Sequence, residues 1–362
     1  MKQIDHQFNF YTIMKTIINF LAVIMLGISF YACQNSSETD SGVKHFRQMQ
    51  FSETPFDLEK GVRQITAEEA KTVNNYQFTY DDMSRLTEVA YCRDTILLPY
   101  GSMRGTARIT YTYEGNKQIK HYFNTEGEQI ESGGAYEAVY TLDDNAMRTA
   151  MAFYDKDGNP IENRNNIHRY TWNKLDNGLI QELRYNLADT MVVMNPFCPF
   201  YELRFEYDDN GYCTRMMNYE ADTLTNCTAE NCGDIGVSYF EFANNDAGDV
   251  LSFSVHNTIG QLSNLYWGWA KRLNTVDENG YVTETAVYDQ DDEYLSGNNV
   301  PVTKNIYDEH GAVVETWSLD KNRNLMNSPR NGVAIVAYKY DELGNRTETT
   351  HYNKDRVEVV TD

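Results

Sequence analysis

The sequence has none of the short motifs that usually mark a catalytic or nucleotide-binding site. It contains no HExxH, no GxSxG, no Walker loop and no GxGxxG between a strand and a helix. Its seven histidines occur singly along the chain. Catalytic groups can be assembled from distant segments, so these absences do not exclude an enzyme. They leave no catalytic residue to name, and the sequence predicts no cofactor.

Basic residues are also scarce. The chain has 31 lysines and arginines against 53 aspartates and glutamates, a net charge of −22. Nucleic acids and anionic lipid surfaces are bound through basic patches, so this balance argues against both as partners. The sequence predicts no nucleic-acid binding.

Metal-binding patterns are missing as well. There is no CxxC, and no histidine lies near the cysteines. Residues 155–160 open like a calcium loop, but Pro160 and Asn166 stand where an EF-hand needs Gly and Glu. We therefore expect a hairpin turn there. Acidic pairs such as Asp143-Asp144 and Asp291-Asp292 are expected in solvated turns, and no metal site is predicted.

The N-terminus carries the one long apolar run, from Thr16 to Ala32, behind Lys15. This pattern is typical of a secretory signal, for which Met14 is a second candidate start. The end of the run resembles a bacterial lipobox, which implies that residues 1–32 are removed and that Cys33 is acylated, as with palmitate. An ordinary signal peptide and a single-span anchor remain as alternatives, although polar residues 34–42 disfavour an anchor.

The resemblance to lipoproteins predicts an exported protein held at the cell envelope by lipid on Cys33. Gln34 is not the aspartate that retains enterobacterial lipoproteins at the inner membrane, which favours the outer membrane. Residues 33–65 have scattered aromatics and a polar start, and we expect a flexible tether there. The mature chain would hold 29 basic and 52 acidic residues, a net charge of −23.

Five cysteines follow Cys33, which fits an oxidising compartment. Cys227 and Cys232 are the best candidate pair, because they would close a short loop. Cys198 and Cys213 form a second candidate pair, and Cys92 would then stay free.

Most of the mature chain has a β pattern. Thr66 and Glu69 fit a capping box and predict one short helix. From Tyr76 onward, Tyr, Phe, Val and Thr alternate with polar residues, and Gly, Asn and Asp interrupt the alternation.

A phrase repeats along this β region. Its anchors lie 29 to 35 residues apart, at Tyr80, Tyr113, Leu142, Trp172, Tyr207, Phe242, Val276, Tyr307 and Tyr340. Most anchors are followed by Asp or Asn and then Gly, which suits a hairpin: the acidic side chain accepts backbone N–H groups and Gly supplies a positive φ. One hairpin buries too little apolar area to be stable alone, so neighbouring units must complete its core.

These repeats predict an all-β fold for residues 66–362. We expect about nine hairpin units of about 33 residues in an extended, curved or solenoid-like sheet, preceded by the one short helix. The 27 tyrosines fit this prediction, since Tyr favours strands and tolerates a half-exposed sheet face.

Residues 80–89 (YDDMSRLTEV) and 340–348 (YDELGNRTE) resemble the YD repeat of RHS-type proteins. The resemblance covers about residues 76–360 and implies a β-hairpin architecture, without implying toxin delivery. The composition is also similar to that of surface lipoproteins of the Bacteroides group, which supports a location at the cell surface.

Trp267 and Trp269 flank Gly268. In a strand, both indoles would project from one face and form an aromatic platform for a sugar or a peptide. Alternatively, they fill a buried repeat position, since Trp172 and Trp317 occur at comparable repeat sites. Both interpretations stay open at this point.

The sequence as a whole predicts a non-enzymatic, lipid-anchored envelope protein. It would use a broad β-repeat surface to bind or scaffold an envelope protein or a glycan. The alternative is a glycan-processing hydrolase whose carboxylates converge only in three dimensions.

Overall fold

The computed structural model describes residues 42–50, 52–99, 101, 103, 105–194, 200–228 and 236–360. Backbone contacts divide the chain into two units, one of residues 43–79 and 86–362 and one of residues 1–42 and 80–85. Each unit is considered by itself below. Cys33 and the signal segment lie outside the described residues, and no helix in the described part is long and apolar enough to cross a membrane.

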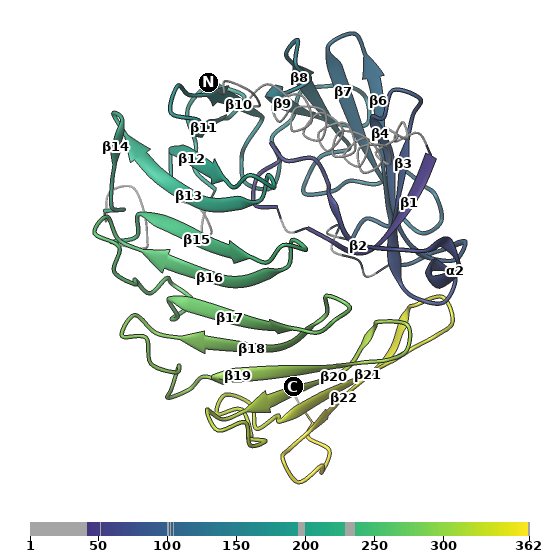
Figure 1. The fold of residues 1–362 in the computed structure, drawn as a ribbon, viewed down its shortest axis with the longest axis vertical. Coiled ribbons are helices and arrows are strands. Elements are labelled where there is room, and N and C mark those ends of the chain that lie inside the picture. Colours follow the sequence, from purple (N-terminus) through teal and green to yellow (C-terminus); the bar gives the residue numbers. More distant parts are fainter. Residues whose placement is uncertain are drawn as a thin grey trace, which may run out of the picture. The chain divides into compact units, whose positions relative to one another are not determined.

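The fold is all-β, as predicted, and is built from nine pairs of consecutive strands (Figure 1). The pairs are β3 (Asn75–Tyr80) with β4 (Leu86–Arg93), β6 (Arg108–Glu114) with β7 (Lys117–Phe123), β8 (Glu137–Leu142) with β9 (Arg148–Tyr154), β10 (Arg169–Lys174) with β11 (Ile180–Tyr185), β12 (Glu202–Tyr207) with β13 (Cys213–Glu220), β15 (Tyr239–Asn244) with β16 (Val250–His256), β17 (Lys271–Val276) with β18 (Val282–Tyr288), β19 (Val302–Tyr307) with β20 (Val313–Leu319) and β21 (Ile335–Tyr340) with β22 (Arg346–Tyr352). Each pair contains one of the nine predicted anchors.

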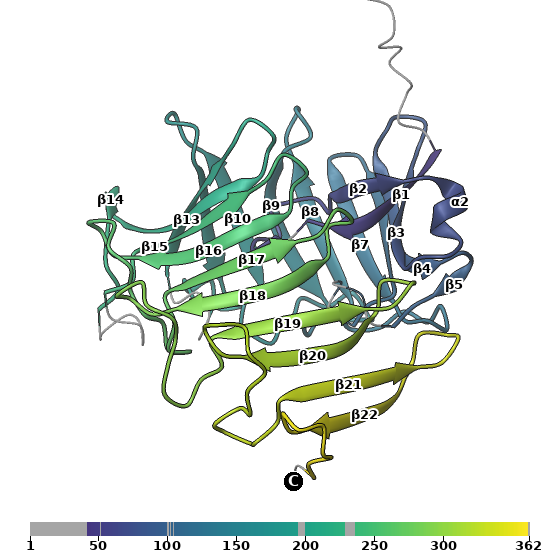
Figure 2. The same ribbon diagram turned by 60° about the horizontal axis from the view of Figure 1, so that its bottom comes forward.

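Neighbouring hairpins join into one open antiparallel sheet. The second strand of each of the first eight hairpins pairs with the first strand of the next, as β20 pairs with β21. Successive hairpins therefore lie side by side in chain order, from the teal β12 to the yellow β22 (Figures 1 and 2). Two short strands, β5 (Ile96–Leu97) and β14 (Thr223–Leu224), pair antiparallel with β4 and β13.

The turn geometry explains the repeated phrase. In the β12–β13 turn, Oδ1 of Asp208 accepts the N–H groups of Asn210 and Tyr212, both at 2.9 Å. Gly211 has a φ of +74°, and the register shifts between Glu206 and Tyr207, so the turn ends in a bulge. The same two side-chain bonds recur at Asp81, Asp143, Asn245, Asp277, Asp308 and Asp341.

The anchor tyrosines link one hairpin to the one before it. The hydroxyl of Tyr340 donates to the carbonyl of Val313 at 3.0 Å, and Tyr307 donates to the carbonyl of Val282 at 2.9 Å. Tyr113 makes the equivalent bond to the carbonyl of Leu86. A half-buried tyrosine at this position thus packs its ring between hairpins and satisfies its hydroxyl.

The second turn follows the same rule in several units, in which Oδ1 of residue 155, 257, 289, 320 or 353 accepts two backbone N–H groups. At residues 155–160, Oδ1 of Asp155 accepts the N–H groups of Asp157 and Asn159, and Tyr154 bridges to Pro160. The predicted hairpin turn at this segment is therefore confirmed. Its side-chain bonds to Asn159 lower the pKa of the Asp155 carboxyl.

The flexible tether predicted over residues 33–65 is wrong for the part that the structure describes. That part contains β1 (Gly42–Met49) and β2 (Gly61–Ile65), which pair in an antiparallel register. Between them, Thr54 is buried and Phe56 packs against the hydrophobic core. The composition was misleading because the polar residues of this segment are paired with distant side chains inside the fold.

The predicted helix is confirmed as α2 (Ala67–Ala70). The side chain of its N-cap residue, Thr66, accepts the N–H of Glu69, which is one half of the predicted capping box. Only one turn forms before the chain enters β3.

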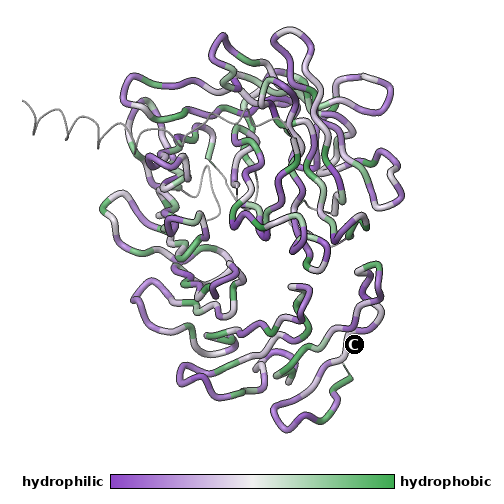
Figure 3. The backbone as a smooth tube through the Cα atoms, turned by 45° about the vertical axis from the view of Figure 1, so that its right-hand side comes forward, coloured by the Kyte–Doolittle hydropathy of each residue, from purple (hydrophilic) through white to green (hydrophobic). Residues whose placement is uncertain are grey.

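The main hydrophobic core lies on the middle hairpins, from β8 to β16. Its largest members are fully buried aromatics, including Trp172, Tyr140, Phe205 and Phe240. Hydrophobic and hydrophilic stretches alternate along the hairpins (Figure 3), as expected for strands with one packed face. The core thins toward the C-terminal end, where β22 has four exposed residues in succession.

The first prediction concerns turn strain. Ala146 stands where most units have Gly and adopts a φ of +62° on the surface. We expect Ala146→Gly to raise the free energy of unfolding by about 0.5–1 kcal/mol, because left-handed backbone is strained for Ala. Gly158→Ala, at a φ of +79°, is the matched control and should lower it by about 1 kcal/mol. Urea denaturation measures both, and a loss of stability in Ala146→Gly would contradict the turn assignment.

Candidate functional site

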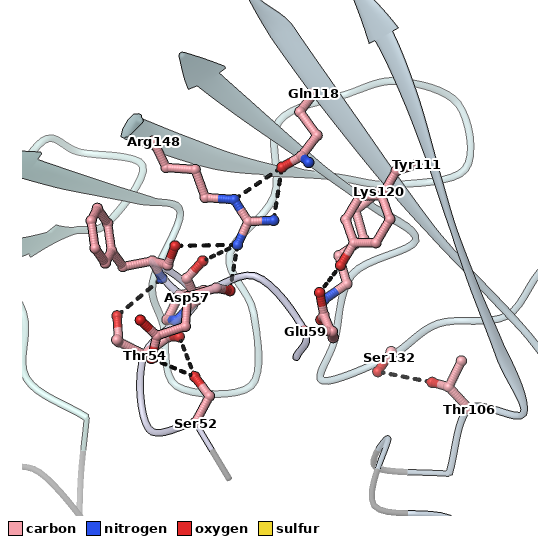
Figure 4. A network of polar contacts seen from close by, with 12 residues as sticks. Ser52, Thr54, Asp57, Glu59, Thr106, Tyr111, Gln118, Lys120, Ser132 and Arg148 are labelled. Carbon is pink, nitrogen blue, oxygen red and sulfur yellow. Dashed lines mark hydrogen bonds and ion pairs between the residues drawn. The ribbon is translucent and has the colours of Figure 1, made fainter. Parts of the chain in front are cut away.

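A buried arginine holds the segment between β1 and β2 (Figure 4). Nη1 of Arg148 donates to the carbonyls of Pro55 at 2.8 Å, Phe56 at 3.4 Å and Asp57 at 2.5 Å. Its Nε and Nη2 donate to Oε1 of Gln118 at 2.9 and 2.7 Å. One guanidinium therefore satisfies three carbonyls of a segment that has no regular partner strand.

Glu59 on the same segment lies between two groups of the second hairpin. Its carboxylate accepts hydrogen bonds from the ammonium of Lys120 and the hydroxyl of Tyr111. Burial would raise the pKa of Glu59, but the charges of Lys120 and Arg148 outweigh burial and lower it. Burial would lower the pKa of Lys120, and the charge of Glu59 raises it instead. Both groups are thus held in their charged forms.

Two further carboxylates complete this interior network. Asp57 accepts hydrogen bonds from Ser52 at 3.0 Å and Tyr207 at 2.8 Å, and burial raises its pKa. Glu182 is fully buried on β11 and accepts from Trp172 Nε1 at 2.8 Å. Glu182 also acts electrostatically on Asp57, so these carboxylates lie near one another inside the fold, and sequence reasoning did not find them.

The sequence did contain a weak signal for this segment. Residues 56–59 read Phe-Asp-Leu-Glu, a period-two alternation typical of extended chain. The network's charged groups are buried or largely buried and are bonded to protein partners, so its evident role is to fix the segment inside the fold.

Residues 60–93, which run from the segment between β1 and β2 to the end of β4, also reach the turns of the C-terminal half. Four contacts join them to the turns of four hairpins: Lys60 Nζ to the Asn210 carbonyl at 2.6 Å, Arg63 Nη1 to the Glu278 carbonyl at 3.3 Å, the Asn74 N–H to the His310 carbonyl at 2.8 Å, and Arg93 Nη2 to the Glu342 carbonyl at 2.7 Å. The order along these residues matches the order of the hairpins. These contacts bring residues 74–98 beside the last two hairpins.

A groove opens at this junction, with a cavity volume of about 910 Å³. Residues 74, 91, 93 and 98 form one wall, and residues of β19–β22 and their turns form the other. The lining combines aromatic rings, amides and charges of both signs: Tyr91, Tyr338, Tyr340, Asn74, Asn305, Arg93, His310, Arg346, Asp308 and Asp341. A volume of this size accommodates a ligand of several rings.

The carboxylates of the groove's two aspartates already accept backbone hydrogen bonds. Oδ1 of Asp308 accepts the N–H groups of His310 and Ala312, and Oδ1 of Asp341 accepts those of Leu343 and Asn345. Side-chain and backbone bonds from Asn345 lower the pKa of Asp341. A carboxylate held ionised in this way is suited to accepting hydrogen bonds and poorly suited to donating a proton.

The groove's cations lie against its tyrosines and carbonyls. The guanidinium of Arg346 stands over the Tyr338 ring, with Cζ 4.4 Å from the ring centroid. Nη1 of Arg93 points to Oδ1 of Asn74 at 3.5 Å, while its Nη2 binds the Glu342 carbonyl. The polar groups are thereby fixed around half-buried aromatic faces.

Trp267 and Trp269 do not lie in a strand. Residues 265–268 form a tight turn in which the N–H of Gly268, at a φ of +89°, donates to the Leu265 carbonyl at 2.8 Å. The two indoles stack at 4.8 Å and pack, partly buried, against Phe253 of the core. The contacts therefore agree with the packing interpretation, and the pair lies outside the groove's lining.

Of the two predicted cysteine pairs, one is wrong and the other stays a prediction. Cys213 is a free thiol, so its pairing with Cys198 is wrong, and Cys92 is a free, buried thiol. Cys227 is disulfide-bonded, but Cys232 lies outside the described residues, so that pairing stays a prediction. In the described part of the chain, no group of three or more His, Cys, Asp and Glu side chains is arranged to hold a metal ion.

The second prediction tests the interior ion pair. Glu59→Gln should lower the free energy of unfolding by about 3–5 kcal/mol near pH 7, because it leaves Lys120 buried and unpaired. Since the folded-state pKa of Glu59 lies below its ordinary value of 4.5, its stabilising contribution is complete above that pH and is lost as the pH falls through the folded value. The difference between wild type and variant should therefore shrink in acid.

Urea titrations at pH 7 and pH 3.5 measure this difference. The double variant Glu59→Leu with Lys120→Met is the control and should recover part of the loss, because it removes both charges. An equal loss at both pH values would contradict the role given to the Glu59 charge.

No family model matches the chain, and no curated protein matches it. Among solved structures, the chain is similar to a TcdB2–TccC3 chain, at 11% identity and a TM-score of 0.21, covering 81% of this chain and 17% of that one. A structure of the Photorhabdus luminescens Tc holotoxin pore matches at 13% identity and a TM-score of 0.21, covering 80% and 17%. A porin-like protein from Bacteroides uniformis matches at 11% identity and a TM-score of 0.21, covering 85% and 93%. The chain thus spans about a sixth of the length of the toxin chains.

Proposed function

We propose that the chain is a lipid-anchored envelope protein that binds a glycan in the groove between residues 74–98 and the last two hairpins. The observation that carries the proposal is the groove's lining, in which half-buried tyrosine rings are surrounded by fixed amide, guanidinium and carboxylate groups. Aromatic faces pack on the C–H surface of a sugar ring, and planar polar side chains hydrogen-bond its hydroxyls.

The engaged aspartates support binding without catalysis. Asp308 and Asp341 each hold two backbone N–H groups of their own turn, so protonating either would weaken the wall of the site. The interior carboxylates Asp57 and Glu59 belong to the network that holds the N-terminal segment, away from this lining. A binding module therefore fits the geometry better than a hydrolase does.

The envelope location rests on the signal-like N-terminus and Cys33. The acidic chain would be repelled from anionic membrane surfaces, so a lipid on Cys33 and the residues up to 41 would hold the β-repeat domain near the outer membrane. With its YD-type turns, the protein would be a distant relative of RHS-type repeat proteins. In this protein the hairpins would carry a binding site.

The third prediction tests the groove. Tyr338→Ala should weaken binding of an envelope glycan about tenfold, because it removes a ring from the groove wall. Tyr338→Phe keeps the ring and should bind within about twofold of wild type. A panel of purified envelope polysaccharides, screened and then titrated by calorimetry against the secreted Cys33→Ser chain, measures both variants.

Equal binding by wild type and Tyr338→Ala, with the variant still folded, would remove the groove as the glycan site. If the chain binds an envelope protein and no glycan, the proposed ligand class would be wrong. Slow cleavage of a bound glycan would favour the hydrolase alternative.

The fourth prediction tests the anchor. Cys33→Ser should move the protein from the membrane fraction to the soluble fraction, because acylation at Cys33 would be lost. Fractionation with immunodetection measures the distribution, and Cys92→Ser is the control that should leave it unchanged. Continued membrane retention of Cys33→Ser would contradict the lipid anchor.

A further inference from the structure

Arg93, on the wall of the groove that residues 74–98 form, has only neutral hydrogen-bond partners in the described part of the chain. Its Nη2 donates to the Glu342 carbonyl at 2.7 Å, and its Nη1 donates to Oδ1 of Asn74 at 3.5 Å. A guanidinium carries five N–H donors, more than these two acceptors use. The charge of Arg93 and its remaining donors are therefore left beside the cavity.

Most arginines that the structure describes have an acidic partner instead. Examples are the ion pairs of Arg63 with Asp249 and of Arg323 with Glu284. The chain has 53 acidic residues against 31 basic ones, so carboxylates are in surplus. An arginine that keeps neutral partners in so acidic a chain is suited to binding an acidic group from outside.

A second cation comes from the opposite wall. Arg346, at the start of β22, lies over the Tyr338 ring, with Cζ 4.4 Å from the ring centroid. The charged side chains of the lining are Arg93, Lys339, Arg346, Asp308, Asp341 and Glu342. These are three basic and three acidic groups, so the groove carries no net negative charge, whereas the chain carries −22. An anionic ligand is repelled less at the groove than by the protein as a whole.

An aromatic ring lies beside Arg93. Tyr91 is two positions earlier on β4, so both side chains project from one face of the strand and both line the groove. The Tyr91 ring centroid lies 4.8 Å from that of Tyr76, and burial raises the pKa of the Tyr91 hydroxyl, which stays uncharged. A sugar ring packed on such an aromatic face can direct an acidic substituent toward a neighbouring guanidinium.

From this arrangement we propose that the glycan of the groove is acidic and that Arg93 binds the carboxylate of a uronic acid. This inference rests on the glycan-binding function proposed above. The planar guanidinium matches the geometry of a carboxylate, and charged N–H···O bonds of this kind are stronger than bonds to a neutral hydroxyl. Arg93 is thus the residue that distinguishes an acidic sugar from its neutral counterpart.

The test compares acidic oligosaccharides with their carboxyl-reduced counterparts, in which each carboxylate becomes a hydroxymethyl group. The probes are oligosaccharides of alginate, hyaluronan and polygalacturonate, titrated by calorimetry into the secreted Cys33→Ser chain. At least one acidic probe should bind about tenfold or more tightly than its reduced form. Arg93→Gln should weaken binding of that acidic probe about tenfold and leave binding of the reduced probe within about twofold.

Arg330→Gln is the matched control. Arg330 also donates to neutral acceptors, the carbonyl of Asn298 at 3.1 Å and Oδ1 of Asn299 at 2.8 Å, but it lies outside the lining. This variant should keep the preference of wild type for the acidic probe.

Three results would overturn the inference. These are a wild-type chain that binds no acidic probe more tightly than its reduced form, a preference that survives in Arg93→Gln, and an equal loss of both probes in that variant, which would make Arg93 a support of the wall. If binding of a glycan still depends on Tyr338 in these cases, the proposed function stands. If no glycan binds in a way that depends on Tyr338, the proposed function is contradicted as well.

Discussion

A side-chain oxygen that accepts two backbone N–H groups is the interaction on which the rest of this structure depends. Asp208 shows it fully: Oδ1 fixes the turn, Gly211 supplies the left-handed residue, and a bulge returns the chain to the ladder. The same arrangement, repeated about every 33 residues, sets hairpin after hairpin in one register. Each hairpin then contacts its neighbour through a tyrosine hydroxyl or a strand edge. The locally formed hairpins therefore join into a continuous sheet.

The sheet alone leaves charged and polar groups that need partners, and the N-terminal segment supplies them. Arg148 binds three consecutive carbonyls of this segment, and Glu59 neutralises Lys120. Further along, Arg93 binds the Glu342 carbonyl of the last turn. Breaking a buried ion pair is more costly than removing it, so these contacts also fix one placement of the segment. The groove lies where residues 74–98 meet the last two hairpins.

The sequence allowed the turn chemistry and the Thr66 cap to be predicted, because each depends on residues within five positions of one another, and the repeats could be predicted because the same turn phrase recurs at a near-constant spacing. The contacts of residues 52–63 could not be predicted in the same way. Arg148 lies 91 residues from Asp57, and Arg63 lies 186 residues from Asp249, and one sequence does not show such pairs. The turn at Gly268 was missed because two Trp residues around one Gly suit a strand as well as a turn. The groove was missed because its walls meet only in the folded chain.

Hydrogen–deuterium exchange of the secreted Cys33→Ser chain tests most directly whether the N-terminal segment is an integral part of the fold. Peptides covering residues 52–65 should exchange as slowly as those of the middle hairpins, and the Asn74 amide, which donates to the His310 carbonyl, should be protected. Arg148→Ala should speed exchange over residues 55–59 before it affects β15 and β16. Rapid exchange throughout residues 52–65 in the unmodified segment, as in a flexible tether, would contradict the arrangement described above.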